Sequence, residues 1–146
     1  MLYYLSLGSN LGDRESTLRS ALQLIEQQIG SVLRCSSFYY SKPWGFTSQN
    51  DFCNLCCALE TDLPPLKVLH LTQAIERSLG RTKKSPIINH QSLITNYSDR
   101  PTDIDLIRVF DNDKKELFMD SPELTLPHRF WQERDFVKTP LAEIMH

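Results

Sequence analysis

The spacing of apolar residues switches between strand-like and helix-like patterns along this chain, and the order of the switches limits its possible folds. Leu2–Leu7 is a short aliphatic and aromatic run that stops at Gly8, which predicts a buried strand followed by a turn. In Asp13–Gln28 the apolar residues recur every three or four positions, which predicts an amphipathic helix that ends at Gly30. The chain therefore begins with a strand and a helix.

The same two patterns recur further along the chain. Apolar runs predict strands at Ser31–Tyr40, Phe52–Thr61 and Thr102–Phe110, and a second helix is predicted from Pro64-Pro65 to Gly80. The order β-α-β-β-α-β predicts an α+β, ferredoxin-like fold: an antiparallel sheet with two helices on one face. We expect residues 1–146 to form one domain, with a short C-terminal tail of helical turns.

Charge and composition argue against several classes of function. The chain has 16 Lys and Arg residues against 18 Asp and Glu residues, so its net charge of −2 does not favour a nucleic-acid binder. No apolar run reaches the length of a membrane-spanning helix, and the N-terminus lacks the basic leader of a signal peptide. We expect a cytoplasmic, monomeric protein that binds neither nucleic acid nor membranes.

Three of the four cysteines lie close together in the predicted strand Phe52–Thr61. Cys53 and Cys56 have the spacing of a zinc-binding or redox pair, but a second ligand pair is absent and the motif does not open a helix. The alternative is that they are small buried strand residues, as is Cys57. We favour this alternative, which implies a reducing compartment.

The strongest chemical signal is Asp103-Ile104-Asp105 in the last predicted strand. Residues two apart in a strand share a face, so the two carboxylates lie about 7 Å apart along the chain while Ile104 enters the core. Mg²⁺ is a natural occupant between them, although a solvated strand face is the simpler alternative. Cations flank the pair along the chain: Arg81, Lys83, Lys84, Arg100, His128, Arg129 and Arg134. This combination favours phosphoryl transfer.

Two further groups of residues suggest ligand contacts. Gly8-Ser9-Asn10-Leu11-Gly12 lacks the Lys-Ser/Thr of a P-loop, so side chains and metal ions would have to hold any nucleotide. Phe52 and Asn54 share a strand face, where an aromatic ring can stack on a flat heterocycle and an amide can read its edge. Gln73 and Glu76 share a helix face. Core packing is the alternative for Phe52, and an ordinary polar surface is the alternative for Gln73 and Glu76.

Motifs along the whole chain resemble one family, the 6-hydroxymethyl-7,8-dihydropterin pyrophosphokinases. The motifs are, in chain order, Leu5-Ser6-Leu7-Gly8-Ser9-Asn10-Leu11-Gly12-Asp13, Ser36-Ser37-Phe38-Tyr39 leading to Pro43 and Gly45, Asp51-Phe52-Cys53-Asn54, Gln73-x-x-Glu76 to Gly80-Arg81, Arg100-Pro101-Thr102-Asp103-Ile104-Asp105, and Leu126-Pro127-His128 to Arg134-x-Phe136. The resemblance implies the family's ferredoxin-like αβα sandwich. It also implies transfer of the intact β,γ-diphosphate of ATP to the hydroxymethyl oxygen of the pterin, with release of AMP in folate biosynthesis.

The resemblance also implies roles for individual residues. The residues expected to act in catalysis are Arg81, Lys84, Arg100, Asp103 and Asp105, and the two aspartates are expected to bind two Mg²⁺ ions. The residues expected to line the pterin pocket are Ser41, Trp44, Phe52, Asn54, Tyr97 and Phe136. The residues expected to contact ATP are Gln73, Glu76, Lys83, His128 and Arg134. A catalytically lapsed family member and a non-enzymatic ligand-binding module of the same fold remain open as alternatives.

Overall fold

The computed structural model describes residues 1–42, 51–80 and 102–145, and contains one main sheet and one two-stranded sheet. The elements are, in order, β1 (Leu2–Ser9), α1 (Arg14–Gln28), β2 (Ser31–Cys35), β3 (Tyr39–Ser41), β4 (Phe52–Glu60), α2 (Pro65–Gly80), β5 (Asp103–Phe110), β6 (Met119–Asp120), β7 (Thr125–Leu126), the 3-10 turn η3 (Trp131–Glu133) and α4 (Asp135–Ile144). Among these described elements, no helix is long and apolar enough to cross a membrane.

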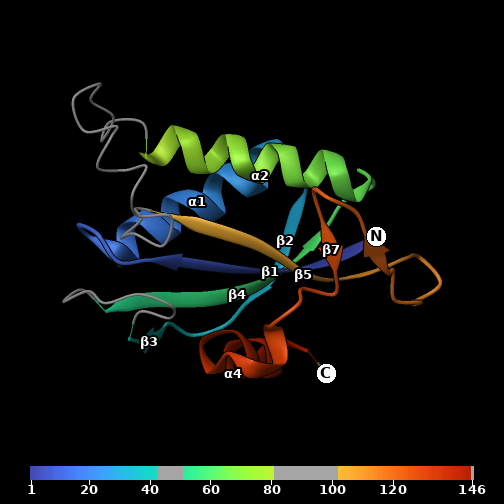
Figure 1. The fold of residues 1–146 in the computed structure, drawn as a ribbon. Helices are drawn as coiled ribbons and strands as arrows, with labels where there is room; N and C mark the ends of the chain where they lie inside the picture. The colour runs from blue at the N-terminus through green and yellow to red at the C-terminus, as the bar shows by residue number, and fades with distance from the viewer. Residues whose placement is uncertain (43–50, 81–101, 146) are drawn as a thin grey trace.

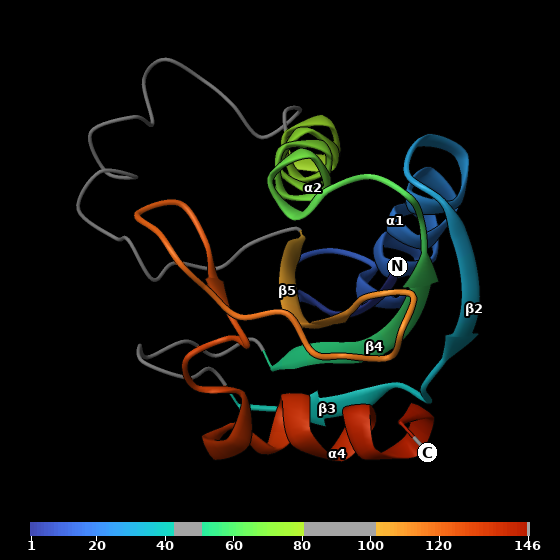
Figure 2. The ribbon, with the colours of Figure 1, turned by 90° about the vertical axis from the view of Figure 1, so that its right-hand side faces the viewer.

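The main sheet has the strand order β2-β4-β1-β5, and β3 pairs with β4 beyond the end of β2. Every pairing is antiparallel. Helices α1 and α2 cover one face of the sheet, whereas α4 covers the other (Figures 1 and 2). The predicted α+β, ferredoxin-like arrangement is therefore confirmed, including the helix layers on both faces that the family resemblance implies.

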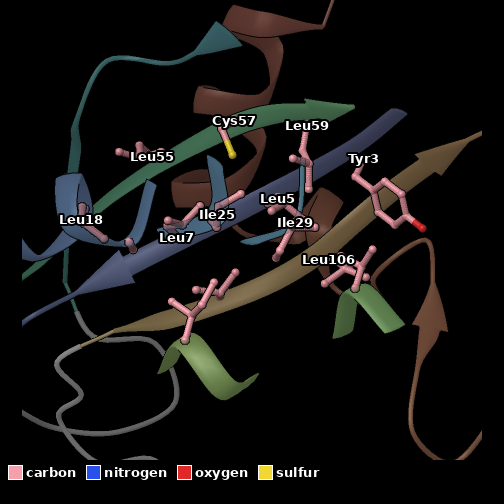
Figure 3. Packing of buried hydrophobic residues seen from close by; sticks show 14 of the residues in the cluster. Tyr3, Leu5, Leu7, Leu18, Ile25, Ile29, Leu55, Cys57, Leu59 and Leu106 are labelled. Carbon is pink, nitrogen blue, oxygen red and sulfur yellow. The ribbon is translucent and has the colours of Figure 1, made fainter. Parts of the chain in front are cut away.

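Two apolar clusters fix these layers. The larger cluster lies between the sheet and α1 and α2, where Leu5 and Leu7 of β1 lie close to Leu18 and Ile25 of α1 (Figure 3). The smaller cluster joins the other face to α4, whose buried residues are Val137, Pro140, Leu141 and Ile144. These residues form an apolar stripe along α4, and the stripe packs the helix against the sheet.

The structure differs from the predicted elements at three places. The first strand continues through Gly8 to Ser9, because both residues still pair with β4. The strand predicted at Ser31–Tyr40 is broken into β2 and β3, because the Ser36 hydroxyl accepts the Cys56 N–H at 2.9 Å in place of a backbone carbonyl. The tail contains a ten-residue helix, α4, in addition to the short η3 turn.

Candidate active site

Strand β5 carries the two aspartates along the edge of the main sheet. Ile104 and Leu106 are buried against the α1 and α2 side, so Asp103 and Asp105 face the opposite side and are half-buried. The predicted shared face of the aspartate pair (Asp103 and Asp105), with Ile104 in the core, is confirmed. Asp103 lies opposite Gly8 on the neighbouring strand β1.

A β-bulge in β5 brings His128 to the same edge. Leu5 lies opposite Leu106 and Tyr4 lies opposite Arg108, so Ile107 is the extra residue in the ladder. The carbonyl of Ile107 accepts the backbone N–H of His128 at 2.8 Å. The segment after β7 is thereby attached to the strand that carries the aspartates.

A pocket of about 500 Å³ lies along this edge of the sheet. Six residues expected to act in catalysis or to contact ATP line it together: Gln73, Glu76, Asp103, Asp105, His128 and Arg134. Glu76 contacts the aspartate strand directly, because its Oε2 accepts the Ile104 N–H at 2.7 Å. Residues from α2, β5 and the C-terminal segment therefore meet in one pocket.

The surroundings of His128 disfavour the charged form of its imidazole. Burial lowers its pKa below the ordinary value of 6.5, and the positive charge of Arg134 lowers it further. The negative charge of Asp103 opposes both effects without cancelling them. The Arg134 guanidinium lies over the rings of Phe130 and Phe136, 5.4 and 5.7 Å from their centroids.

A second group of side chains lies beside the aspartate pair on the same face of the sheet. Asn54 is buried, and its amide nitrogen donates to the Ser41 hydroxyl at 2.8 Å and to the Tyr39 carbonyl at 3.1 Å. A Cβ built on Gly8 would lie 2.9 Å from Asn54 Oδ1 and 3.5 Å from Phe52 Cδ1. Phe52 and Asn54 therefore share a face, as predicted, and Ser41, Phe52 and Asn54 together form what we call the amide cradle.

Gly8 joins the amide cradle to the aspartate pair. It lies opposite Asn54 on β4 and opposite Asp103 on β5, so these three residues form one row across three strands. Because residues opposite one another share a face, a glycine at the centre leaves room for the side chains of Asn54 and Phe52 to lie close over β1. The buried amide of Asn54 and the carboxylate of Asp103 therefore lie on one face of the sheet, on either side of β1.

Comparison with known proteins identifies the family of this chain. A family model described as 7,8-dihydro-6-hydroxymethylpterin-pyrophosphokinase (HPPK) matches residues 4–146. The chain belongs to the HPPK family.

Two similar proteins align with nearly the whole of this chain. It is 46% identical over 143 residues to a 2-amino-4-hydroxy-6-hydroxymethyldihydropteridine pyrophosphokinase of Porphyromonas gingivalis strain W83, covering 98% of this chain and 90% of the relative. It is 37% identical over 142 residues to the protein of that name from Bacillus subtilis strain 168, covering 97% and 76%. The expected family membership is confirmed.

A solved structure supports the HPPK fold independently of close sequence similarity. The crystal structure of an HPPK-DHPS in complex with substrates superimposes with a TM-score of 0.68 at 14% sequence identity. The match covers 98% of this chain and 40% of that longer chain. At this identity the likeness concerns the fold alone.

Several residues that the HPPK resemblance implicates lie outside the described part of the chain. These are Trp44 of the expected pterin pocket, Tyr97 of the same pocket, and the expected phosphate-contacting residues Arg81, Lys83, Lys84 and Arg100. Phe136 lies within the described part, in the first turn of α4, where it is half-buried against the smaller apolar cluster and lies under Arg134. Phe136 therefore packs against the cluster and also offers its ring to the Arg134 guanidinium.

The local sequence pattern does not reveal that Gly8 lies between the amide cradle and the aspartate pair. The pattern predicts that the first strand stops at Gly8, yet Gly8 lies within β1 at the centre of the row. Glycine inside an apolar strand is itself a signal of a close approach by another backbone or a ligand. That signal was available in the sequence, but the residues opposite Gly8 were not.

The cysteines take structural positions in this fold. Cys53 is buried in the larger apolar cluster and Cys56 in the smaller one, so their side chains lie on opposite faces of the sheet. They cannot bind one metal ion together, and the interpretation as buried strand residues is confirmed. Burial raises the pKa of Cys56 to about 12, and it also raises the pKa of Cys57.

Proposed function

We propose that this chain transfers the intact diphosphate of ATP to the hydroxymethyl group of 6-hydroxymethyl-7,8-dihydropterin and releases AMP, as a step of folate biosynthesis. The proposal is supported by the row Asn54–Gly8–Asp103, in which a buried amide and a carboxylate share one face of the sheet. The family match covers residues 4–146, which include both ends of that row.

The aspartate pair fits the requirements of Mg²⁺. Mg²⁺ prefers oxygen ligands and is commonly held by one or two carboxylates together with substrate phosphates and water. Asp103 and Asp105 supply two carboxylates on one face, and both line the pocket of about 500 Å³. We propose that they hold two ions, which when bound would supply positive charge to the phosphate oxygens.

The chain's own residues would orient the two substrates for an in-line transfer. The pterin oxygen forms a bond to the β-phosphorus of ATP while the bond from that phosphorus to the α,β-bridging oxygen breaks, so AMP departs and the hydroxyl proton is released. In the amide cradle, Asn54 would fix the edge of the pterin, with Phe52 and Phe136 contacting its faces. This arrangement brings the exocyclic hydroxymethyl group toward Asp103.

The C-terminal segment would bind the phosphates. Arg134 carries a positive charge in the pocket, and the imidazole of His128, whose pKa is lowered, can donate a hydrogen bond there. Gln73 of α2 can donate a hydrogen bond to a phosphate oxygen through its amide nitrogen.

Trp44 and Tyr97 would complete the pterin pocket. The remaining proposed phosphate contacts are Arg81, Lys83, Lys84 and Arg100, in the segment between α2 and β5.

We further propose that the chain acts as a monomeric, single-domain enzyme in the cytoplasm. Buried, unoxidised cysteines are compatible with a reducing compartment. The near-neutral charge balance supports a small-molecule substrate over nucleic acid.

The test is to incubate the protein with ATP, Mg²⁺ and 6-hydroxymethyl-7,8-dihydropterin and to separate the nucleotides by chromatography. The proposal predicts that AMP forms only when the pterin and Mg²⁺ are both present. Formation of ADP would contradict the mode of transfer. If a nucleotide analogue binds but no turnover occurs, the chain is a lapsed member of the family and the proposal is wrong.

A further inference from the structure

The peptide group between the two aspartates has an unusual partner. Ile104 is central to the aspartate pair, and its backbone N–H donates to Glu76 Oε2 at 2.7 Å. Strand β5 is the last strand of the main sheet, so donors on its outer side have no neighbouring strand to pair with. A glutamate side chain from α2 therefore takes the place that a further strand would occupy.

Glu76 is well placed to fix the position of this strand. It follows directly after Ile75, which is 2% exposed, and Thr72 one turn earlier is fully buried. Helix α2 lies alongside β5 in both views of the molecule (Figures 1 and 2). Because the accepting carboxylate belongs to a helix that is anchored by buried residues, this charge-assisted hydrogen bond restrains the Asp103–Ile104 peptide more tightly than a bond to a mobile loop would.

The chemistry of Glu76 argues against a main role as a direct contact of the triphosphate. An ionised carboxylate only accepts hydrogen bonds, so it cannot donate to phosphate oxygens. Gln73, one turn earlier on the same pocket, has an amide that can donate. The negative charge of Glu76 is instead directed to a backbone donor within the aspartate strand.

We propose that Glu76 is a positioning residue, which accepts the Ile104 N–H and thereby sets the relative placement of Asp103 and Asp105. This assignment rests on the proposed function for the role of the two aspartates, and it adds a positioning role to the expected contact of Glu76 with ATP. A second bond supports the same edge further along: the Ile107 carbonyl accepts the His128 N–H at 2.8 Å. The aspartate strand is thus attached on both sides of Asp105.

The test measures hydrogen exchange of the Ile104 amide by NMR in the full chain without metal or nucleotide. We expect Glu76→Ala to accelerate this exchange about tenfold or more, because a bond to a charged acceptor is lost. Glu76→Asp keeps the charge but is one methylene shorter, so it should accelerate exchange as well. Glu76→Gln keeps an acceptor oxygen at the right reach and should restore protection.

A second measurement follows the consequence for the aspartate pair. The Mg²⁺ concentration that gives half-maximal binding of a non-hydrolysable ATP analogue should rise severalfold in Glu76→Ala and Glu76→Asp, with rescue in Glu76→Gln. Gln73→Ala is the matched control on the same helix face. It should weaken binding of the analogue without changing exchange of the Ile104 amide.

Two results would overturn the assignment. One is unchanged Ile104 exchange in both Glu76→Ala and Glu76→Asp, with amides of β1 and β4 serving as the folding reference in the same spectra. The other is a Glu76→Gln variant as defective as Glu76→Ala in both measurements, since that would make the charge, and not the bond, decisive. Failure of the proposed function appears separately, as an absence of AMP with the Ile104 exchange pattern intact.

Discussion

The row Asn54–Gly8–Asp103 makes a sharp prediction about Gly8→Ala. Gly8 is not among the described residues with a positive φ, so its backbone accepts alanine. The new Cβ would lie 2.9 Å from Asn54 Oδ1, a separation that forces one group to move. The contact with Phe52 Cδ1 at 3.5 Å is ordinary, so Asn54 is the residue expected to shift.

The cost can be worked from the bonds that Asn54 makes. Its amide donates to the Ser41 hydroxyl at 2.8 Å and to the Tyr39 carbonyl at 3.1 Å. Each such bond contributes about 0.5–1.5 kcal/mol to the free energy of unfolding, so loss of both would lower that free energy by about 1–3 kcal/mol. If Asn54 then no longer presents its amide to the pterin, loss of one protein–pterin hydrogen bond of about 0.5–1.5 kcal/mol corresponds to a rise in the pterin KM of about 2- to 13-fold.

The assay compares the pterin KM with the dissociation constant of a non-hydrolysable ATP analogue. We expect the first to rise in Gly8→Ala and the second to stay within about twofold, because the clash lies in the amide cradle. The double variant Gly8→Ala/Asn54→Ala should be little worse than Asn54→Ala alone, since the two changes act on one contact. An unchanged pterin KM in Gly8→Ala, or full additivity in the double variant, would refute the reasoning.

Three further outcomes are expected. Asp103→Asn or Asp105→Asn should lower turnover by about 10²-fold or more through loss of charge at the phosphates, with the circular dichroism spectrum retained; near-normal rates in both would contradict the role of the aspartate pair. In the metal-free protein, the pKa of His128 measured by NMR should lie below 6.5, and because the folded state binds this proton less readily than the unfolded state, acidification should lower the free energy of unfolding. Arg134→Gln should raise the pKa of His128, and a lowered pKa in this variant would contradict the stated cause. Iodoacetamide should modify exposed Cys35 before the three buried cysteines, as read by peptide mass spectrometry; early modification of a buried cysteine would contradict the fold.

Much of the fold could be predicted because its elements have clear local periods. The helices α1 and α2 were predicted nearly to their ends by three- and four-residue apolar spacing, and Pro64-Pro65 marked where α2 begins. The break between β2 and β3 could not be predicted. It depends on a hydrogen bond from Cys56 to Ser36, residues 20 positions apart, and no local pattern records that contact.

The candidate site likewise has features that local sequence patterns predict and features that depend on distant contacts. The shared face of Asp103 and Asp105 follows from strand geometry alone, and so does that of Phe52 and Asn54. The position of Gly8 between these pairs depends on the register of three strands, which single-strand patterns do not specify. The bond from Glu76 to Ile104 likewise depends on how α2 lies over the edge of the sheet.

The most direct measurement of the central claim follows a radioactive label placed on the β-phosphate of ATP. With the pterin and Mg²⁺ present, the account predicts that all transferred label appears in the pterin diphosphate and that the AMP released is unlabelled. Label retained in ADP would show transfer of a single phosphoryl group, and label in free pyrophosphate would show transfer of the nucleotide. Either result would contradict the account.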